Sequence, residues 1–401
     1  MVREGVAPAP PAPSPTPSPS PSGAPSWGRR IAVGVVWLAS GFLLALVALG
    51  LGARWLDPRT YWWAQLVAVV LPYLTAALIG TLFIAAGLRR WRLMALGAVA
   101  LVLVGLRAQP QHWLAGPDAA DDDLRLVTFN VPERLPADAM ADSMRAFVER
   151  EAPDVVALQD AWVRGPRRRR PAWRAPQIRG VIDTLAYGLA VPAALPGVGG
   201  WKRDATGVPL LVRDDGPAEV IEQEAVIVSD PRDNQASQAI RSVLRWQGRD
   251  LVLYDVHVRS FGDAKPWADP SFRLLRPSTW DPSLRRLRSV YRDRAIDVDR
   301  IAEAIAADSL PVVVAGDFNS TADNWTYRRL RTAGGVSRTD AFRARGGLAW
   351  GRTFHAETPV VRIDHILVDP ALAVTGAETR SVGFSDHRPV LARLRWRDAE
   401  P

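Results

Sequence analysis

Cysteine is absent from this chain of 401 residues, and lysine occurs only twice, at Lys202 and Lys265. The absence of thiols excludes disulfide bonds, thiolate zinc sites and a cysteine nucleophile. The basic residues are therefore nearly all arginine, which we attribute to a compositional bias of the genome rather than to a function. The formal net charge of +8 agrees with anionic partners but does not identify one.

Histidine is also scarce, and three of the five histidines adjoin short apolar runs. These three are His257, His365 and His387. The other two, His112 and His355, stand outside such runs, and we expect them to have ordinary surface or packing roles. We therefore expect the functional residues to lie at the ends of the apolar runs.

One run, 310–315, is followed directly by Gly316, Asp317, Phe318 and Asn319. The run is short and rich in valine, which predicts a buried strand. Side chains alternate between the two faces of a strand, so Asp317 and Asn319 should lie on the same face. An acid and an amide side by side are suited to positioning a water molecule or a metal ion. A tight turn after the strand would also explain Asp317.

Five further strand-like runs end or begin in polar side chains. These are Asn130 after 124–129, Gln159 and Asp160 after 154–158, His257 after 251–256, Asp364 and His365 after 360–363, and Asp386 and His387 before a run that starts at Val390.

In this order the segments TFN, LQD, YDVH, GDFN, RIDHI and SDHRPV resemble the motifs of the endonuclease/exonuclease/phosphatase superfamily, the fold of deoxyribonuclease I-like enzymes. The resemblance covers roughly Asp121 to Trp396. One position departs from the pattern, because the family usually has Glu after the Gln of the second motif and this chain has Asp160. The shorter side chain puts the geometry of a metal site in question but keeps a hard oxygen ligand.

The predicted strands alternate with predicted helices at 136–151 and 282–307, which is typical of a layered α/β domain. The resemblance implies a more specific fold, with two mixed β-sheets packed face to face as a sandwich and flanked by helices in four layers. It also implies that the active site lies at one end of the sandwich, where the loops after the strands converge.

The resemblance further implies a hydrolase that cleaves phosphoester bonds with Mg²⁺ or Mn²⁺. Oxygen donors suit these hard cations, and the expected ligands are Asp160, Asn130 and Asp386. Taken alone, Asp160 could instead cap a strand end.

Five residues are expected to form the catalytic set. Asp317 would orient or deprotonate the attacking water, and Asn319 would hold the phosphate or the water. His387 would contact a non-bridging phosphate oxygen, while Asp364 fixes its tautomer and favours its charged form. His257 would donate to the phosphate or protonate the leaving group. His365 points to the opposite face of its strand, and we expect a structural role.

The N-terminal part of the chain predicts a membrane anchor. Residues 1–28 are rich in Pro, Ala and Ser and should form a disordered tail. Residues 29–108 contain three uncharged runs, at 31–51, 61–88 and 93–106, of which the first two are long enough to span a bilayer and the third is marginal. A cleavable signal peptide and buried helices of a soluble domain are the alternatives. A linker, 109–123, would lead to the catalytic domain, 124–398.

The placement of arginine predicts the orientation of this anchor. Arginines at 29 and 30 precede the first run, and those at 89, 90 and 92 follow the second, whereas the connection between the two runs carries only those at 54 and 59. The positive-inside rule then places the N-terminus and the second connection in the cytoplasm. With two spans the catalytic domain would be cytoplasmic. We expect three spans, hence a multi-pass protein of the cell (inner) membrane with an extracytoplasmic catalytic domain.

A basic run, 165–174, contains four consecutive arginines, Arg167 to Arg170. It could bind a nucleic-acid backbone or anionic lipid headgroups, or it could form a solvated loop.

Several functions share the expected site. We favour a membrane-anchored phosphodiesterase or endonuclease acting on nucleic acid. A phospholipid headgroup phosphodiesterase, similar to bacterial sphingomyelinases, and a sugar or inositol phosphatase are alternatives within the enzyme class. A membrane sensor that binds phosphate without catalysis is the alternative of another class. The expected partners are therefore nucleic acid or phospholipid, and the sequence indicates no protein partner.

Overall fold

The computed structural model describes residues 27–108, 118–165, 172–193, 205–229, 236–265, 270–273, 275–346, 351–358 and 360–397. The predicted N-terminal tail up to residue 26, His112, most of the predicted linker and the four arginines of the basic run lie outside these residues.

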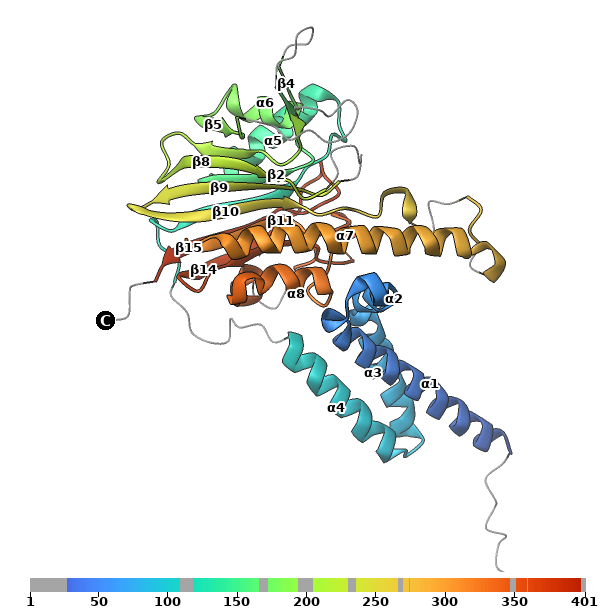
Figure 1. Ribbon diagram of the computed structural model, residues 1–401. Coiled ribbons are helices and arrows are strands. Elements are labelled where there is room, and N and C mark those ends of the chain that lie inside the picture. Colours follow the sequence, from blue (N-terminus) through green and yellow to red (C-terminus); the bar gives the residue numbers. More distant parts are fainter. Residues whose placement is uncertain are drawn as a thin grey trace, which may run out of the picture.

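Two six-stranded mixed sheets form the centre of the catalytic domain (Figure 1). The strands of the first are, in spatial order, β14 (Leu372–Thr379), β15 (Val390–Trp396), β1 (Leu124–Asn130), β2 (Val155–Gln159), β7 (Leu210–Arg213) and β5 (Tyr187–Ala190). The second contains β12 (Thr339–Asp340), β13 (Asp364–Val368), β11 (Val312–Asp317), β10 (Arg249–His257), β9 (Gln238–Trp246) and β8 (Ala218–Val226). A small third sheet is made of β4 (Trp173–Arg174), β3 (Val163–Arg164) and β6 (Ala205–Thr206).

Helices cover the outer faces of both large sheets. Helices α5 (Ala137–Glu151) and α6 (Pro176–Ile182) lie on one side of the strands, and α7 (Asp281–Ala307) and α8 (Trp325–Arg331) lie on the other (Figure 1). The short helix α9 (Ala341–Arg345) follows β12, and short 3₁₀ turns occur at Gly262–Ala264, Pro277–Thr279 and Ala333–Gly335. This arrangement confirms the predicted four-layer α/β sandwich, and α5 and α7 match the two helices expected from the sequence.

The alternation of side chains along each strand explains the layers. In β1, Leu124 and Leu126 face the second sheet and pack in one cluster with residues of β11. The intervening Val127 and Phe129 face outward and pack against α5. The outer face of β11 packs in the same way against α7. β1 and β11 therefore bury both faces, as their valine-rich runs predicted.

Two parallel strand pairs determine where the polar residues lie. β1 runs parallel to β2, with Asn130 opposite Gln159, and β10 runs parallel to β11, with His257 opposite Asp317. Helices α5 and α7 form the two crossover connections between these pairs. The polar residues that follow the strands are therefore brought to the same end of the sandwich.

Gly316 allows β10 and β11 to approach closely at this end. Its φ angle is +144°, and a Cβ atom at this position would lie 1.9 Å from the carbonyl oxygen of Val256. Only glycine fits, because any side chain would push the two strands apart. The glycine before Asp317 therefore maintains the spacing between His257 and Asp317.

The N-terminal helices form a separate bundle whose helices are α1 (Trp27–Gly52), α3 (Leu71–Gly87) and α4 (Trp91–Ala108). They extend away from the sandwich, whereas the 3₁₀ turn at Ala53–Trp55 and α2 (Pro58–Val69) lie against α7 and α8 (Figure 1). The bundle has a small apolar core of its own around Val47, Leu71 and Leu78.

The second apolar run, expected as one helix over 61–88, is divided between α2 and α3, which meet at an angle of 56°. Pro72 lies in the first turn of α3. Its ring and its missing N–H are tolerated there, but they would disrupt a helix that continued from α2. Proline therefore separates a segment that packs on the catalytic domain from an apolar helix.

Among the described residues, one helix, Arg30–Trp55, is long and apolar enough to cross a membrane. Helices α2 and α3 would add a second if the bent pair were one span, and Trp91–Leu106 is a shorter apolar helix. A signal sequence near the N-terminus has the same properties. Association with a membrane is thus only weakly indicated by these properties, and the multi-pass anchor remains a prediction.

Candidate active site

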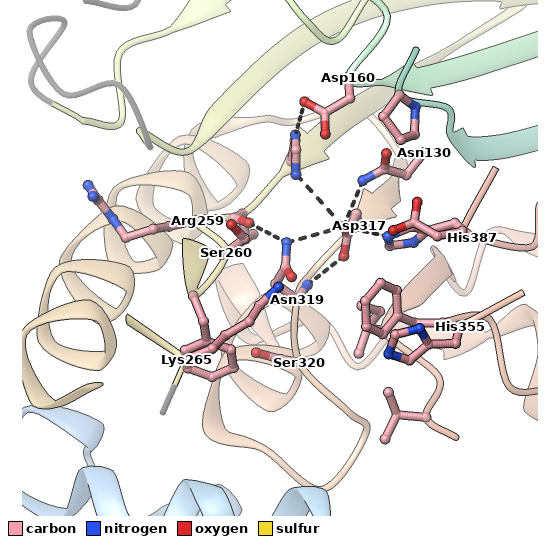
Figure 2. Close-up of a pocket in the computed structure, with 18 of the residues that line it drawn as sticks. Asn130, Asp160, Arg259, Ser260, Lys265, Asp317, Asn319, Ser320, His355 and His387 are labelled. Carbon is pink, nitrogen blue, oxygen red and sulfur yellow. Dashed lines mark hydrogen bonds and ion pairs between the residues drawn. The ribbon is translucent and has the colours of Figure 1, made fainter. Parts of the chain in front are cut away.

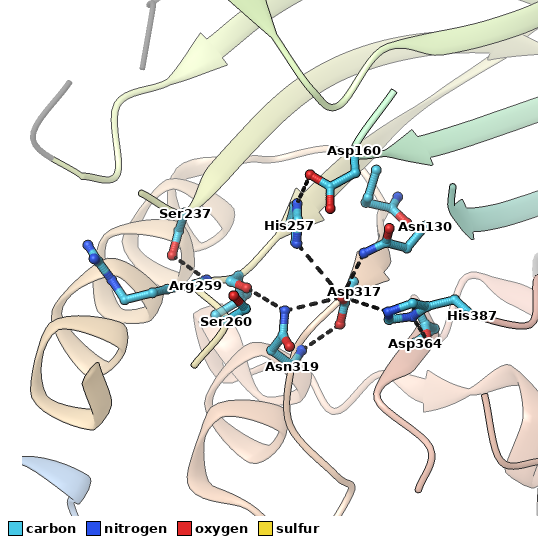
Figure 3. A network of polar contacts seen from close by, with 12 residues as sticks. Asn130, Asp160, Ser237, His257, Arg259, Ser260, Asp317, Asn319, Asp364 and His387 are labelled. Carbon is cyan, nitrogen blue, oxygen red and sulfur yellow. Dashed lines mark hydrogen bonds and ion pairs between the residues drawn. The ribbon is translucent and has the colours of Figure 1, made fainter. Parts of the chain in front are cut away.

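The polar residues of five predicted motifs meet at one end of the sandwich. Asp317 lies opposite both His257 and Asp364 in the second sheet, because β11 pairs with β10 on one side and with β13 on the other. The first sheet supplies Asn130 at the end of β1 and His387 just before β15. Figure 3 shows these side chains pointing toward one another around Asp317.

Asp317 is the centre of this network. Its side chain is 1% exposed, and one carboxylate oxygen, Oδ2, accepts hydrogen bonds from the amides of Asn130 at 2.9 Å and Asn319 at 3.1 Å. The other oxygen accepts the backbone N–H of Asn319 at 2.7 Å. Burial and the neighbouring charge of Asp364 raise the pKa of Asp317 to about 6. The group is therefore ionised at neutral pH but remains a usable base.

Two imidazoles approach the same oxygen of Asp317. Nε2 of His257 lies 3.8 Å from Oδ2, and Nε2 of His387 lies 3.9 Å from it. On its other side, His387 donates Nδ1–H to Asp364, with its Nδ1 atom 3.0 and 3.1 Å from the two carboxylate oxygens. Burial opposes the charge on His387, but the carboxylate of Asp364 outweighs it and raises the pKa of His387 to about 9. At neutral pH this ring is a doubly protonated donor.

Asp160 connects the first sheet to the second histidine. Its Oδ1 lies 3.7 Å from Nδ1 of His257, so the shorter side chain still reaches the site. Asp160 and Asn319 both have left-handed backbones, with φ of 57° and 46°. Residues other than glycine rarely adopt this conformation, and such strain often accompanies function. The residue that departs from the family pattern is therefore held in a specialised conformation.

Two buried oxygens at the site have no hydrogen-bond partner among the described residues. They are Oδ1 of Asn130 and Oδ1 of Asp386. The other oxygen of Asp386 pairs with Arg134, and the amide nitrogen of Asn130 is engaged by Asp317. With the half-exposed carboxylate of Asp160, these oxygens make a set of hard donors that fits Mg²⁺ or Mn²⁺.

A second group that could hold a metal consists of Asp317, Asp364 and His387, whose donor atoms lie within 4.8 Å of one another. The carboxylates of this group already accept hydrogen bonds from Asn130, Asn319 and His387. One side-chain oxygen each of Asn130 and Asp386, by contrast, has no partner among the described residues. We therefore regard the oxygen set as the better fit for a metal ion.

A buried polar layer beneath the site was not predicted. Gln159 is fully buried and donates to Oδ1 of Asp255 at 2.6 Å and to Oγ1 of Thr128 at 3.1 Å. Burial raises the pKa of Asp255 well above its usual range. These contacts join β2 to β10 across the two sheets. Asp255 itself is fully buried in this layer.

His365 lies away from this centre. It is fully buried between Phe318 and Tyr327, and its Nε2 lies 3.0 Å from the carbonyl oxygen of Ser320. The structural role expected from its position on the opposite face of β13 agrees with these contacts.

A cavity of about 600 Å³ opens over the network (Figure 2). Besides Asn130, Asp160, His257, Asp317, Asn319, Asp386 and His387, its lining includes four residues with basic side chains, Arg134, Arg259, Lys265 and His355. His355 had been expected to have an ordinary surface or packing role. Arg259 follows the YDVH segment by two residues, and the other three stand outside the motifs. The cavity therefore combines a buried carboxylate with several basic side chains, an arrangement that could serve phosphoester hydrolysis.

A family model described as the endonuclease/exonuclease/phosphatase family matches residues 127–387. The chain belongs to this family. Its members are phosphoester hydrolases and typically depend on a divalent metal. No curated protein matches the chain.

Several solved structures are similar to the chain. An endonuclease/exonuclease/phosphatase from Bacteroides vulgatus is 22% identical, with a TM-score of 0.45, covering 69% of this chain and 99% of its own. A family protein from Leptotrichia buccalis is 14% identical, with a TM-score of 0.48, covering 68% and 100%. The human Nocturnin catalytic domain with bound sulfate is 15% identical, with a TM-score of 0.46, covering 72% and 100%. No conclusion about substrate follows from similarity at this level.

The pair formed by His387 and Asp364 predicts a measurable titration. In the metal-free protein, NMR should follow the His387 ring through a pKa near 9. Replacing Asp364 with Asn removes the main favourable charge and leaves burial to oppose protonation, so the pKa should fall well below 9. The Asp183→Asn variant, outside the cavity, is the control. A His387 pKa that stays near 9 in Asp364→Asn would contradict the role given to Asp364.

Proposed function

We propose that this protein is a membrane-anchored phosphoester hydrolase that uses a divalent metal ion and a water molecule activated by Asp317. The observation that carries the proposal is the convergence of two imidazoles and two amides on the buried carboxylate of Asp317. An arrangement that served only packing would have no need to bury a carboxylate beside a second carboxylate, Asp364.

Asp317 is the group that takes the proton from the attacking water. Its raised pKa makes it a stronger base than an exposed aspartate while leaving it ionised at neutral pH. Asn319 binds both of its oxygens and Asn130 binds one, which fixes the orientation of the carboxylate. Because these donors are already in place, little reorganisation is needed when the water arrives.

The two histidines act on the phosphoryl group. His387, charged and oriented by Asp364, donates Nε2–H to a non-bridging oxygen and stabilises the negative charge that develops there. His257 lies between Asp160 and Asp317, where it can donate to the phosphate or to the departing oxygen. The residues that make these contacts come from neighbouring strand ends: Asp160 follows β2, His257 ends β10, Asp317 ends β11 and Asp364 begins β13.

Asp160, Asn130 and Asp386 would hold the metal ion. The unpartnered oxygens of Asn130 and Asp386 support this assignment. A bound Mg²⁺ or Mn²⁺ would supply positive charge to the phosphate oxygens and the leaving group. The protein would hold these three oxygens in place at the wall of the cavity.

A sensing role without catalysis is less well supported. Such a protein needs phosphate donors but gains nothing from a buried base at the centre of the site. The side chains expected to act in catalysis lie together around Asp317. The same residues would act on diesters and on monoesters, because they all address the reacting phosphate.

The arrangement of the N-terminal helices supports the three-span anchor. Helix α2 lies on the catalytic domain, so the connection between α1 and α3 is on the same side as that domain (Figure 1). Helix α4 leads back to the domain, while the turn between α3 and α4 lies at the far end of the bundle. That far turn contains Arg89 and Arg90, and Arg92 lies beside it in the first turn of α4. The positive-inside rule then assigns the catalytic domain to the extracytoplasmic side.

The first test is hydrolysis of phosphoesters by the purified full-length protein. Activity should require Mg²⁺ or Mn²⁺, disappear with chelator and return with metal. Asp317→Asn keeps the shape of the side chain but cannot accept a proton, so the rate should fall by about 10² to 10⁴ with metal present. Asp293→Asn, on the exposed face of α7, is the matched control. An active Asp317→Asn protein, or full activity in chelator, would refute the proposal.

The absence of cysteine makes the topology directly measurable. In bacterial cells that express single-cysteine variants, a membrane-impermeant maleimide should label Glu149→Cys on the catalytic domain without permeabilisation. Arg92→Cys, beside the turn between α3 and α4, should react only after the membrane is opened. Labelling in the reverse pattern would place the catalytic domain in the cytoplasm.

A further inference from the structure

The N-terminal segment forms part of the wall of the active-site cavity. Val69, the last residue of α2, lines the cavity together with Val360 and Val361. Tyr73, in the first part of α3, donates its hydroxyl to the carbonyl oxygen of Val360 at 2.9 Å. In Figure 2 the pale blue ribbon of this segment lies directly below the cavity. The junction between α2 and α3 is therefore at the rim of the site.

Buried polar contacts fix this segment to the catalytic domain. Gln65 is 2% exposed and donates to the carbonyl oxygens of Ala53 and Leu56 at 2.8 and 3.0 Å. Its own side-chain oxygen accepts the backbone N–H of Trp325 at 3.0 Å and the amide of Asn324 at 3.2 Å. Every hydrogen-bonding atom of the Gln65 side chain is thus engaged, which is typical of a specific interface.

The same interface is connected to the catalytic loop. The Oδ1 atom of Asn324 accepts both the backbone N–H and the hydroxyl of Thr321, at 2.9 and 2.8 Å. Thr321 lines the cavity two residues after Asn319. A second contact, the ion pair between Arg59 and Asp299, holds α2 on α7. The N-terminal segment therefore has a defined position relative to Asp317.

The apolar wall at Val69 continues onto an exposed apolar surface. Val70 is 42% exposed and Tyr73 is 44% exposed, and farther along α3 the exposed fraction is 75% for Phe83 and 54% for Ile84. Apolar side chains of α1 and α4 are exposed in the same way. An apolar surface of this extent on three helices is unusual in water and is the kind that a bilayer covers.

From this continuity we infer that the substrate is a phosphoester of a membrane lipid, bound with its phosphate at Asp317 and its apolar chain against Val69 and Val360. The inference rests on the proposed hydrolase activity and adds the class of substrate. A soluble phosphoester would make no use of an apolar wall contributed by a membrane anchor. A lipid whose chain follows α3 could reach the cavity from the bilayer surface without leaving apolar surroundings.

The test uses the full-length protein in nanodiscs and two series of esters. These are the methyl, octyl and dodecyl esters of p-nitrophenyl phosphate, and the corresponding alkyl phosphates for monoesterase activity. Within each series the reacting bond stays the same and only the alkyl chain changes. Wild-type kcat/KM should rise by at least about tenfold from methyl to dodecyl, the gain from burying roughly two methylene groups. Supercoiled and single-stranded DNA are offered in parallel.

Anchoring alone could favour long chains by concentrating them in the lipid, so variants separate the two effects. Val69→Asn should reduce the ratio of dodecyl to methyl kcat/KM by about tenfold, because it removes the apolar wall. Val99→Asn makes the same change on the exposed face of α4, away from the cavity, and should keep the wild-type ratio. If Val69→Asn does not fold, Val360→Asn provides the same comparison.

The outcomes distinguish the two claims. Hydrolysis without chain-length preference, or equal ratios in the Val69 and Val99 variants, would overturn the lipid inference and leave the hydrolase proposal standing. Faster cleavage of DNA than of any dodecyl ester would overturn it in favour of nucleic acid. No metal-dependent hydrolysis of any ester or of DNA would remove the proposed function itself.

Discussion

The structure of the site depends on one buried carboxylate, that of Asp317. A charge in this position is costly unless several donors surround it. The two parallel strand pairs provide those donors, because they bring the ends of β1, β2, β10 and β11 to one edge, and Gly316 keeps β10 and β11 close enough for His257 to reach the carboxylate. The fold thus assembles a base and its partners from segments up to 187 residues apart in the chain.

The two histidines have different environments and, as a result, different capacities. His387 is buried next to Asp364 and is held in its charged form, whereas His257 lies between Asp160 and Asp317 at the edge of the cavity. A charged donor fixed on one side of the base and a second imidazole on the other provide complementary contacts for a phosphoryl group. Asp160, one methylene shorter than the Glu that the family usually has, still reaches His257 from a left-handed backbone position.

The sandwich and the family could be predicted from the sequence because the features that define them lie within short segments of the chain. Short valine-rich runs define the strands, and the polar residues that follow them define the active edge, so all of the expected catalytic side chains meet there. The docking of α2 was not predictable. Gln65 and Asn324 are 259 residues apart, and neither has a neighbour that signals the contact. Pro72 was visible but lies inside an uncharged run, so hydropathy joined two helices that proline separates. His355 and Arg134 reach the cavity only through the folding of loops.

The pH dependence of hydrolysis tests the central claim, that ionised Asp317 activates the water. The full-length protein with saturating metal should show a kcat/KM that falls with unit slope below a pKa near 6, because protonation of Asp317 removes the base. An unchanged rate from pH 7 to pH 5, in protein that remains folded, would show that another group activates the water and would contradict this account of the site.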